Sequence, residues 1–275
     1  MAQPSPVQTS VSASPGNAPA GTIDNPGLAE VKSRVAYAAL TPGLLALFVA
    51  AASTLRHPVA GDSAVDADAI ITAGGSTAGV QTLSGASLDG AVGDDPMRIA
   101  RNLTFTFTSH ADWDATTITV AGKDVDGEYL SETFAVPNGG NATVTGNALF
   151  TQVDSVSIPA QSGTGGAFTM GVGAKLGPLD IAAAGVVALE NTRSAAAYAA
   201  GETAGVVRKG RVRVTTEEAV SEGGPVFVRL VTSGDEVYGA FRMSADANDC
   251  ARVLSAKWAQ TTTGSGTALL DINLP

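Results

Sequence analysis

Two runs of alternating residues near the C-terminus constrain the fold more than any other feature. Residues 211–214 and 226–230 each alternate polar with β-branched or aromatic side chains. This is the period of a strand with one buried face. The segment between the runs contains Gly223-Gly224-Pro225, and such residues favour turns. The pattern predicts two strands paired as a hairpin.

Four further segments alternate in the same way, at residues 103–108, 117–120, 133–136 and 153–158. Turn signals stand between them at Asp126-Gly127, Asn138-Gly139-Gly140 and residues 163–166, because Gly and Asn accept positive φ. Short strands at regular spacing predict a small sandwich or barrel. Only 15% of residues are charged and 5% aromatic, a composition that favours strands over long helices. The chain is therefore predicted to be all-β.

The charge balance is strongly acidic. The formal net charge is −10, with 26 acidic and 16 basic residues. Binding to nucleic-acid phosphates needs clustered Lys and Arg, and the cluster formed by Arg208, Lys209, Arg211 and Arg213 is too small to provide it. Alternation places Arg211 and Arg213 on one face of a strand, which we expect to be solvated or to contact another subunit. No nucleic-acid partner is expected.

Neither an oxidising compartment nor a membrane is indicated. The single Cys250 excludes an intrachain disulfide. Residues 1–27 lack the basic and apolar regions of a signal peptide. The apolar run at residues 42–52 is shorter than the roughly 20 residues needed to cross a bilayer. We expect it to form a buried strand or a short helix.

Few residues could carry catalysis or hold a metal. His57 is interpreted as part of a turn or core edge, and His110 as part of a strand-end loop without the further nitrogen or sulfur ligands of a zinc site. Residues 124–128 resemble a fragment of a calcium loop but lack its full pattern; a hairpin turn is favoured, and incidental calcium binding stays open. The glycines of residues 171–177 lack the spacing of a phosphate-binding loop and are expected to flank a strand end. Cys250 is expected to be a small buried apolar residue. We therefore predict no catalytic residues, no cofactor, no metal site and no enzymatic activity.

Two blocks of the chain resemble the structural cement, or head decoration, proteins of tailed bacteriophages. The C-terminal block contains GRVRVTTEEAVSEGGPVFVR, GAFRMSADANDCARVLSAKWAQ and ALLDINLP, and the N-terminal block contains LTPGLLALF and RHPVAGD. The segment VVALENTRSAAAYAAGETAGV is expected to follow the N-terminal block directly, but it begins only at Val186. Residues 65–179 therefore resemble an insertion, entering at loops around Gly61 and Gly177-Pro178. Within it, ADWDATTITVAGKDVDGEYLSETFAVPNGG resembles a β-domain that recurs in phage virion proteins.

The resemblance implies a three-part organisation. Residues 1–24 would form an extended N-terminal arm, residues 25–64 plus 180–275 a discontinuous capsid-binding β-barrel or β-sandwich, and residues 65–179 an inserted immunoglobulin-like sandwich that projects outward. Such a protein would be made in the bacterial host cytoplasm and would lie on the outer surface of the virion capsid. It would bind the major capsid protein of an HK97-like shell and stabilise the expanded head. Homotrimers at three-fold positions are expected, with the arm contacting neighbouring subunits.

Two other functions stay open. A tail tube or fibre component would also suit repeated β-domains. Alternatively, the inserted domain could be a carbohydrate-binding module that contacts host-surface glycans weakly through Trp113 and Tyr129.

Overall fold

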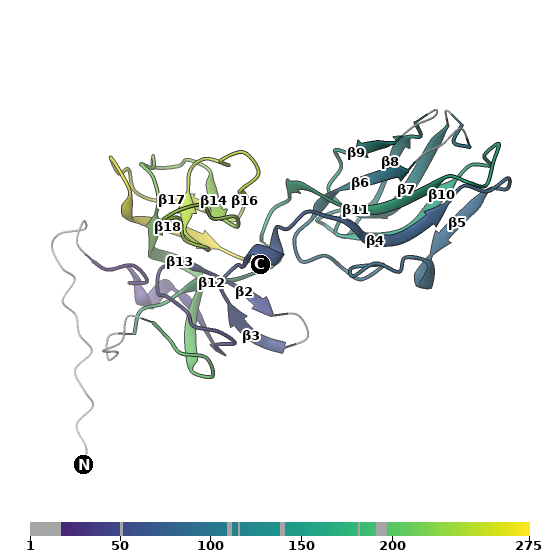
Figure 1. Ribbon diagram of the computed structural model, residues 1–275. Helices are drawn as coiled ribbons and strands as arrows, with labels where there is room; N and C mark the ends of the chain where they lie inside the picture. The colour runs from purple at the N-terminus through teal and green to yellow at the C-terminus, as the bar shows by residue number, and fades with distance from the viewer. Residues whose placement is uncertain are drawn as a thin grey trace, which may run out of the picture.

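The computed structural model describes residues 18–49, 52–108, 112–114, 116–137, 141–180, 182–190 and 197–275. These residues form β-strands and three short 3-10 turns, η1 (Pro26–Leu28), η2 (Ala60–Asp62) and η3 (Gly85–Ser87). The predicted all-β class is confirmed. Figure 1 shows the strands gathered in two lobes that are joined by two passages of the chain. Within the described part of the chain, no helix is long and apolar enough to cross a membrane.

The first lobe contains one ten-stranded sheet. Its strands are β1 (Glu30–Val35), β2 (Leu45–Val49), β3 (Ala52–Arg56), β12 (Ala183–Val187), β13 (Thr203–Thr216), β14 (Val226–Arg229), β15 (Phe241–Arg242), β16 (Cys250–Val253), β17 (Ala256–Trp258) and β18 (Gly266–Asn273). The strand order is β16-β14-β15-β13-β12-β2-β3, β1 and β18 also pair with β13, and β17 pairs with β18. The long β13 is thus the common neighbour that organises the lobe.

The sheet curls until its ends approach each other. Ala36, directly after β1, forms an isolated parallel bridge with Leu55 of β3, and the Tyr37 amide donates to the Leu55 carbonyl at 2.6 Å. Within the described residues no ladder joins β1 to β3 beyond this bridge, so the sheet is barrel-like without a fully paired seam. One core lies around Trp258, Phe241 and their neighbours, and a smaller one lies inside the curl, with Leu40, Leu55 and Tyr198.

Part of the predicted N-terminal arm pairs within its own chain. The amides of Gly21 and Asp24 donate to the carbonyls of Arg213 and Arg211, and Ile23 bridges Val212. Residues 21–24 therefore continue the edge that β1 forms on β13. Gly210 has φ +115, and a Cβ there would stand 3.0 Å from the Ala29 Cα, so a glycine allows this close approach. Residues 1–17 of the predicted arm lie outside the described residues.

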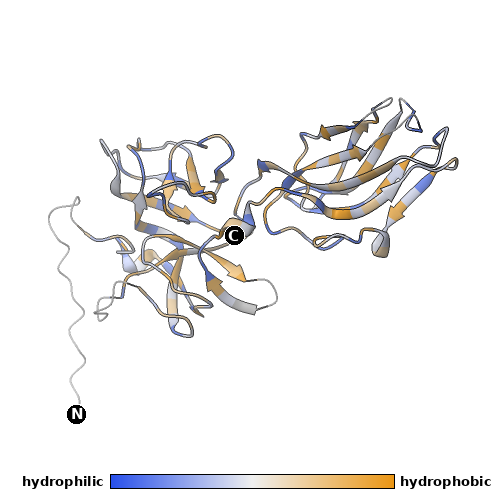
Figure 2. Ribbon diagram, in the orientation of Figure 1, coloured by the Kyte–Doolittle hydropathy of each residue, from blue (hydrophilic) through white to orange (hydrophobic). Residues whose placement is uncertain are grey.

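The second lobe is a two-sheet sandwich. Its strands are β4 (Asp66–Gly75), β5 (Gln81–Ser84), β6 (Arg101–Thr108), β7 (Thr117–Lys123), β8 (Tyr129–Ala135), β9 (Ala142–Thr145), β10 (Gln152–Ile158) and β11 (Ala167–Leu176). One sheet has the order β5-β10-β7-β8 and the other β4-β11-β6-β9. β6, β7, β8 and β10 confirm the four strands predicted by alternation. Figure 2 shows apolar and polar residues alternating along many of these strands.

The core of the second lobe is aromatic. The Phe107 and Trp113 rings meet edge to face with centroids 5.2 Å apart, and Phe105 and Phe134 lie 4.8 Å apart. Trp113 is 1% exposed. Tilted and edge-to-face pairs of this kind are favoured by the ring quadrupole.

Two predictions of local structure are wrong. β13 and β14 do not pair as a hairpin, because β15 lies between them, parallel to β13 at Thr216 and antiparallel to β14. The glycines of residues 171–177 also do not simply flank a strand end: Gly171 lies inside β11, where a Cβ would come within 1.8 Å of the Asp66 carbonyl oxygen on β4. Close approach of two backbones, rather than a turn, requires that glycine. The turn predicted at residues 138–140 lies outside the described residues.

Candidate assembly surface

Strand β1 and its flanks expose an unusual number of large apolar side chains. Val31 and Val35 are 42% and 44% exposed, and Leu28 and Tyr37, on either side of the strand, are 78% and 63% exposed. Isolated exposed apolar residues are common on soluble proteins. Four of them along one short segment form the kind of surface that contacts another protein.

The backbone of β1 is also available. Among the described residues, β13 is the strand that pairs with residues 30–35, and the other edge of β1 has no ladder. An edge strand leaves unpaired N–H and C=O groups that can bind another strand. Lys32 and Arg34 stand on the same strand, and Lys32 lies 3.2 Å from the Glu30 carboxylate. The hydrogen bond from Lys32 lowers the pKa of Glu30. We call residues 28–37 the β1 surface.

Charge is divided unequally between the lobes. Residues 66–176 contain twelve acidic and four basic residues, whereas the rest of the chain contains fourteen acidic and twelve basic residues. The second lobe therefore carries a net charge of −8 and the remainder −2. A high like-charge density favours exposure to solvent over close packing against other proteins. The first lobe is the better suited of the two to bury surface in an assembly.

His57 holds the beginning of the first lobe together. Its Nδ1–H donates to the Leu45 carbonyl and its Nε2 accepts from the Thr41 amide, both at 2.7 Å. Burial lowers the pKa of His57, and the hydrogen bond to Leu45 only partly offsets this. The neutral imidazole thus links the segments LTPGLLALF and RHPVAGD, which confirms the turn or core-edge role predicted for it.

An ion pair joins the two ends of the segment RHPVAGD, Arg56 and Asp62. Arg56 donates two hydrogen bonds to the Asp62 carboxylate, both at 2.5 Å, and the same carboxylate accepts from the Val59 amide. The next residue, Ser63, donates through its hydroxyl to the Leu230 carbonyl at 2.9 Å. These hydrogen bonds fix Asp62 and Ser63, where the chain leaves the first lobe.

Residues of the second lobe are anchored at this exit. Arg101, only 4% exposed, donates to the carbonyls of Gly173 and Ser63, at 3.0 and 3.1 Å. Its burial lowers the pKa of the guanidinium. Arg98 donates to the Phe48 carbonyl of β2 at 2.5 Å, and Ile99 is buried in the core of the first lobe. Three nearby residues thus couple the two lobes.

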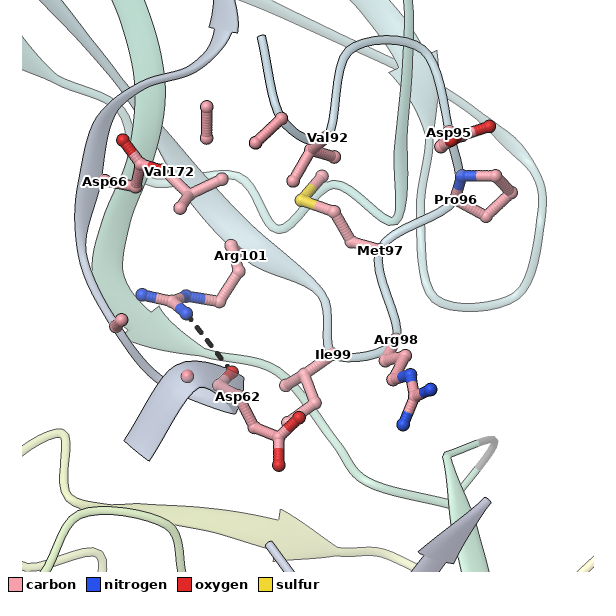
Figure 3. A pocket seen from close by; sticks show the side chains of 14 residues that line it. Asp62, Asp66, Val92, Asp95, Pro96, Met97, Arg98, Ile99, Arg101 and Val172 are labelled. Carbon is pink, nitrogen blue, oxygen red and sulfur yellow. Dashed lines mark hydrogen bonds between the residues drawn. The ribbon is translucent and has the colours of Figure 1, made fainter. Parts of the chain in front are cut away.

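A cavity of about 320 Å³ lies beside this junction. Figure 3 shows Arg101 directed toward Asp62, with Val92 and Met97 across the cavity from it. The volume is at the lower limit for small-molecule sites. However, the Arg101 guanidinium is committed to backbone carbonyls, so the cavity has no free buried donor that would orient a ligand.

A buried ion network organises the other end of the first lobe. Arg229 is completely buried and lies 2.8 Å from carboxylate oxygens of Glu217, Glu236 and Asp246. Arg242 lies 3.0 Å from the same Glu217 carboxylate. Burial alone would raise the pKa of Glu217, but hydrogen bonds from Arg229, the Val237 amide and Arg242 hold it below its usual range. Charged hydrogen bonds here fix the long segment between β14 and β16.

The remaining candidate residues have structural surroundings. Cys250 is 5% exposed, and burial raises the pKa of its thiol to about 12, which leaves it unreactive at neutral pH. The Asp124 carboxylate accepts hydrogen bonds from the Asp126 and Glu128 amides, the arrangement of a turn. No group of three potential metal ligands occurs within the described residues. Arg211 is exposed and lies 3.7 Å from Asp271 on the neighbouring strand. Arg213 is only 4% exposed, so the prediction of a solvated or subunit-contacting position is wrong for Arg213. His110 lies outside the described residues.

The proposed glycan-binding pair is not assembled. Tyr129 is 74% exposed, but Trp113 is 1% exposed and packs in the aromatic core. A stacking platform needs an exposed ring, so the role suggested for Trp113 is wrong. Alternation alone does not separate a core tryptophan from a surface one.

Sequence reasoning did not find the β1 surface or the buried arginines. Residues 30–35 read EVKSRV, which resembles an ordinary half-buried strand, and the signal for Arg229 was only the apolar pattern around it. The exposure of β1 and the burial of Arg229 both depend on which strands are neighbours in the sheet, and the sequence pattern does not give these neighbours.

A comparison with protein families identifies a phage family. The model described as "Structural cement protein (E217 gp24/Pam3 gp6)", a phage family, matches residues 114–273, more than half of the chain. The matched span begins before β7 and ends in β18; residues 25–64 lie outside it. Comparison with curated proteins finds no match.

Proposed function

Since the chain belongs to the phage structural cement protein family, we propose that it binds the outer surface of the shell of a tailed phage and stabilises the expanded head. The partner would be the major capsid protein of an HK97-like shell. A protein that binds the expanded shell and not its precursor stabilises the expanded state by mass action. The role is structural, and we propose no enzymatic step, cofactor, nucleic-acid partner or membrane partner.

The observation that carries the proposal is the β1 surface. It combines exposed apolar side chains with an unpaired strand edge. It also stands on the lobe with nearly balanced charge. These properties suit burial against another protein.

The difference in net charge between the lobes, −8 against −2, supports different roles for two domains. We propose that residues 25–64 plus 180–275 form the capsid-binding domain and that residues 65–179 form an inserted domain. β4 and β11 are paired neighbours at the exit, with Asp66 opposite Val172, so an insertion there leaves the first lobe continuous. The acidic inserted domain would project outward from the virion. We further propose homotrimers at three-fold positions, with residues 1–17 contacting neighbouring subunits.

The test is reconstitution on phage heads that lack the protein. Purified protein is added to expanded capsids, which are then imaged by cryo-electron microscopy and challenged by heat and osmotic shock. We expect ordered density at three-fold positions and a shell that survives harsher conditions.

A pair of matched variants links the result to the β1 surface. Val35→Asp should reduce capsid occupancy at least tenfold, because a charge would replace an apolar contact. Val80→Asp alters a valine that is 73% exposed on the second lobe, and it should bind like the wild type. Absence of binding to expanded capsids would refute the proposal and would favour a tail component, which should form rings without a capsid.

A further inference from the structure

A groove of about 340 Å³ lies beside the turn that joins β16 to β17. Its volume is within the range of pockets that bury most of a small ligand. Pro225, Phe227 and Leu254 contribute apolar lining, and Leu254 is 55% exposed. Arg252 and Lys257 also line the groove and are exposed, and among the described residues its lining includes no acidic side chain. The groove therefore suits an apolar side chain that is flanked by carboxylates.

Hydrogen bonds hold the walls of this groove in place. The Trp258 Nε1–H donates to the Pro225 carbonyl at 3.0 Å, and the Gly223 amide donates to the Trp258 carbonyl at 2.8 Å. The Asp180 carboxylate accepts hydrogen bonds from two backbone amides of the β16–β17 turn, at 2.9 and 2.7 Å. A surface that is already ordered loses little conformational freedom when a partner binds.

The turn between β7 and β8 has the complementary features. Tyr129 is 74% exposed, and residues 123–129 contain three acidic residues and one lysine, a net charge of −2. The Asp124 carboxylate accepts hydrogen bonds from the Asp126 and Glu128 amides, at 2.9 and 3.0 Å, so the turn has a fixed shape. The side chains of Asp126 and Glu128 are exposed beside the tyrosine. We call residues 124–129 the β7–β8 turn.

We propose that the β7–β8 turn of one subunit docks into the groove of a neighbouring subunit. The Tyr129 ring would lie on the apolar lining, and the carboxylates of Asp126 and Glu128 would lie beside Arg252 and Lys257. A buried aromatic ring supplies affinity, and opposite charges around it fix the orientation. Turn and groove are different surfaces, so the contact is heterologous and can close a ring of subunits. The inference rests on the proposed self-association and names the surfaces that perform it.

The position of the turn favours a neighbouring subunit over the same one. The Thr151 amide donates to the Lys123 carbonyl, and the Thr151 carbonyl accepts from the Met97 amide at 2.6 Å, so the turn lies near the segment that enters the first lobe at Ile99. Among the described residues, those lining the groove all belong to the first lobe, and Tyr129 stays exposed. The turn of the same chain therefore does not fill the groove. Because the turn lies at the base of the second lobe, its docking leaves the rest of that acidic lobe free to project.

Engineered disulfides test the contact in the full-length protein. Asp126→Cys is placed in one tagged chain and Leu254→Cys in a chain with a different tag, and the two are co-expressed and oxidised with and without expanded capsids. The native Cys250 is buried and its thiol pKa is raised to about 12, so it should not interfere. In the control, Val80→Cys, at a position that is 73% exposed between β4 and β5, replaces Asp126→Cys. A further sample carries Asp126→Cys and Leu254→Cys in one chain.

We expect a disulfide-linked dimer with both tags, in a yield about tenfold above that of the Val80→Cys control. Tyr129→Ser in the chain with Asp126→Cys should reduce this product about tenfold, because the ring supplies most of the affinity. A yield no higher than that of the control would overturn the inference. Links that form only within the chain carrying both cysteines would also overturn it.

An exchange of charges separates this contact from damage to the fold. Glu128→Lys in the first chain, or Lys257→Glu in the second, should each reduce the linked product about threefold. The two together should restore it to within about twofold, because the attraction is re-formed with the signs reversed. Asp154→Lys, which reverses an exposed charge on β10, should leave the yield unchanged. Loss in both single variants without restoration in the pair would overturn the inference.

Capsid binding is measured on the same samples by sedimentation. Binding to expanded capsids without links between chains refutes the inference alone. Links between chains in solution without capsid binding refute the proposed function alone.

Discussion

Replacement of Arg229 by Met should destabilise the first lobe strongly. The guanidinium is completely buried and holds three carboxylates, those of Glu217, Glu236 and Asp246. Removing one side of a fully buried ion pair costs about 3–5 kcal/mol; here Arg242 stays 3.0 Å from Glu217 and offsets part of that cost. Methionine recovers part of this by packing, so we expect a loss of about 3 kcal/mol, or roughly a 150-fold change in the folding equilibrium.

The loss should depend on pH. The pKa of Glu217 is lowered in the folded protein, despite burial, by its hydrogen bonds from Arg229, the Val237 amide and Arg242. A carboxylate with a lowered pKa contributes stability that is present above its unfolded value, near 4.5, and is lost as the pH falls through the folded value. Without Arg229, Glu217 keeps only the hydrogen bonds from the Val237 amide and Arg242, so its pKa is lowered less against the effect of burial. The gap between the free energies of unfolding of wild type and variant should therefore narrow as the pH falls from 7 toward the lowered pKa of Glu217.

The two tryptophans allow a lobe-specific assay. Trp258 lies in the core of the first lobe and Trp113 in that of the second. In a Trp113→Phe background, urea unfolding followed by fluorescence reports the first lobe alone, which avoids treating two lobes as one transition. Arg252→Met, which changes an exposed arginine on β16, is the matched control and should stay within about 0.5 kcal/mol of wild type. A loss below about 1 kcal/mol for Arg229→Met, or one independent of pH, would refute the reasoning.

Three further substitutions test the structure. The pKa of His57 is lowered by burial, so wild type should lose stability as the pH falls below about 6.5, where the unfolded chain takes up the proton first. The free energy of unfolding of His57→Gln should lack that dependence between pH 7.5 and 5.5. If it fell with pH as steeply as in wild type, the role given to His57 would be contradicted. Gly171→Ala places a Cβ 1.8 Å from a carbonyl oxygen and should cost the second lobe about 2–3 kcal/mol by Trp113 fluorescence, whereas Gly79→Ala, in open space, should be silent. Ile99→Ala should lower the urea midpoint reported by Trp258, with a cost of about 2–4 kcal/mol; a change confined to the second lobe would show that Ile99 does not couple the lobes.

Alternation was a reliable guide to strands but not to their neighbours. β6 (Arg101–Thr108) and β10 (Gln152–Ile158) match the patterned segments closely, because an apolar stripe on one face requires burial. The prediction that β13 and β14 form a hairpin was wrong because strand pairing depends on which other strands lie at the edge of β13. Here β15 pairs with both strands, and Glu217, directly after β13, binds Arg229 of β14 and Arg242 of β15. Such long-range ion pairs leave no local trace in the sequence.

The candidate surface was hidden for a related reason. Val31 and Val35 indicate burial by their residue type, but in the folded chain no described element covers them and they are 42% and 44% exposed. The motifs LTPGLLALF and RHPVAGD could be recognised from the sequence. The structure adds that the His57 ring hydrogen-bonds to Thr41 and Leu45 and so joins the two motifs. The sequence predicted a turn or core edge at His57, but its hydrogen-bond partners could be identified only from the folded structure.

The junction between the two lobes is held by side chains as well as by the backbone. The chain enters and leaves the second lobe through paired strands, with Asp66 of β4 opposite Val172 of β11. Two flexible connections would let the second lobe, with its net charge of −8, turn freely relative to the first lobe. Ile99 in the core of the first lobe and Arg98 on the Phe48 carbonyl oppose such motion. Both residues belong to the second lobe and lie directly before β6, so they restrict how the second lobe can turn relative to the first.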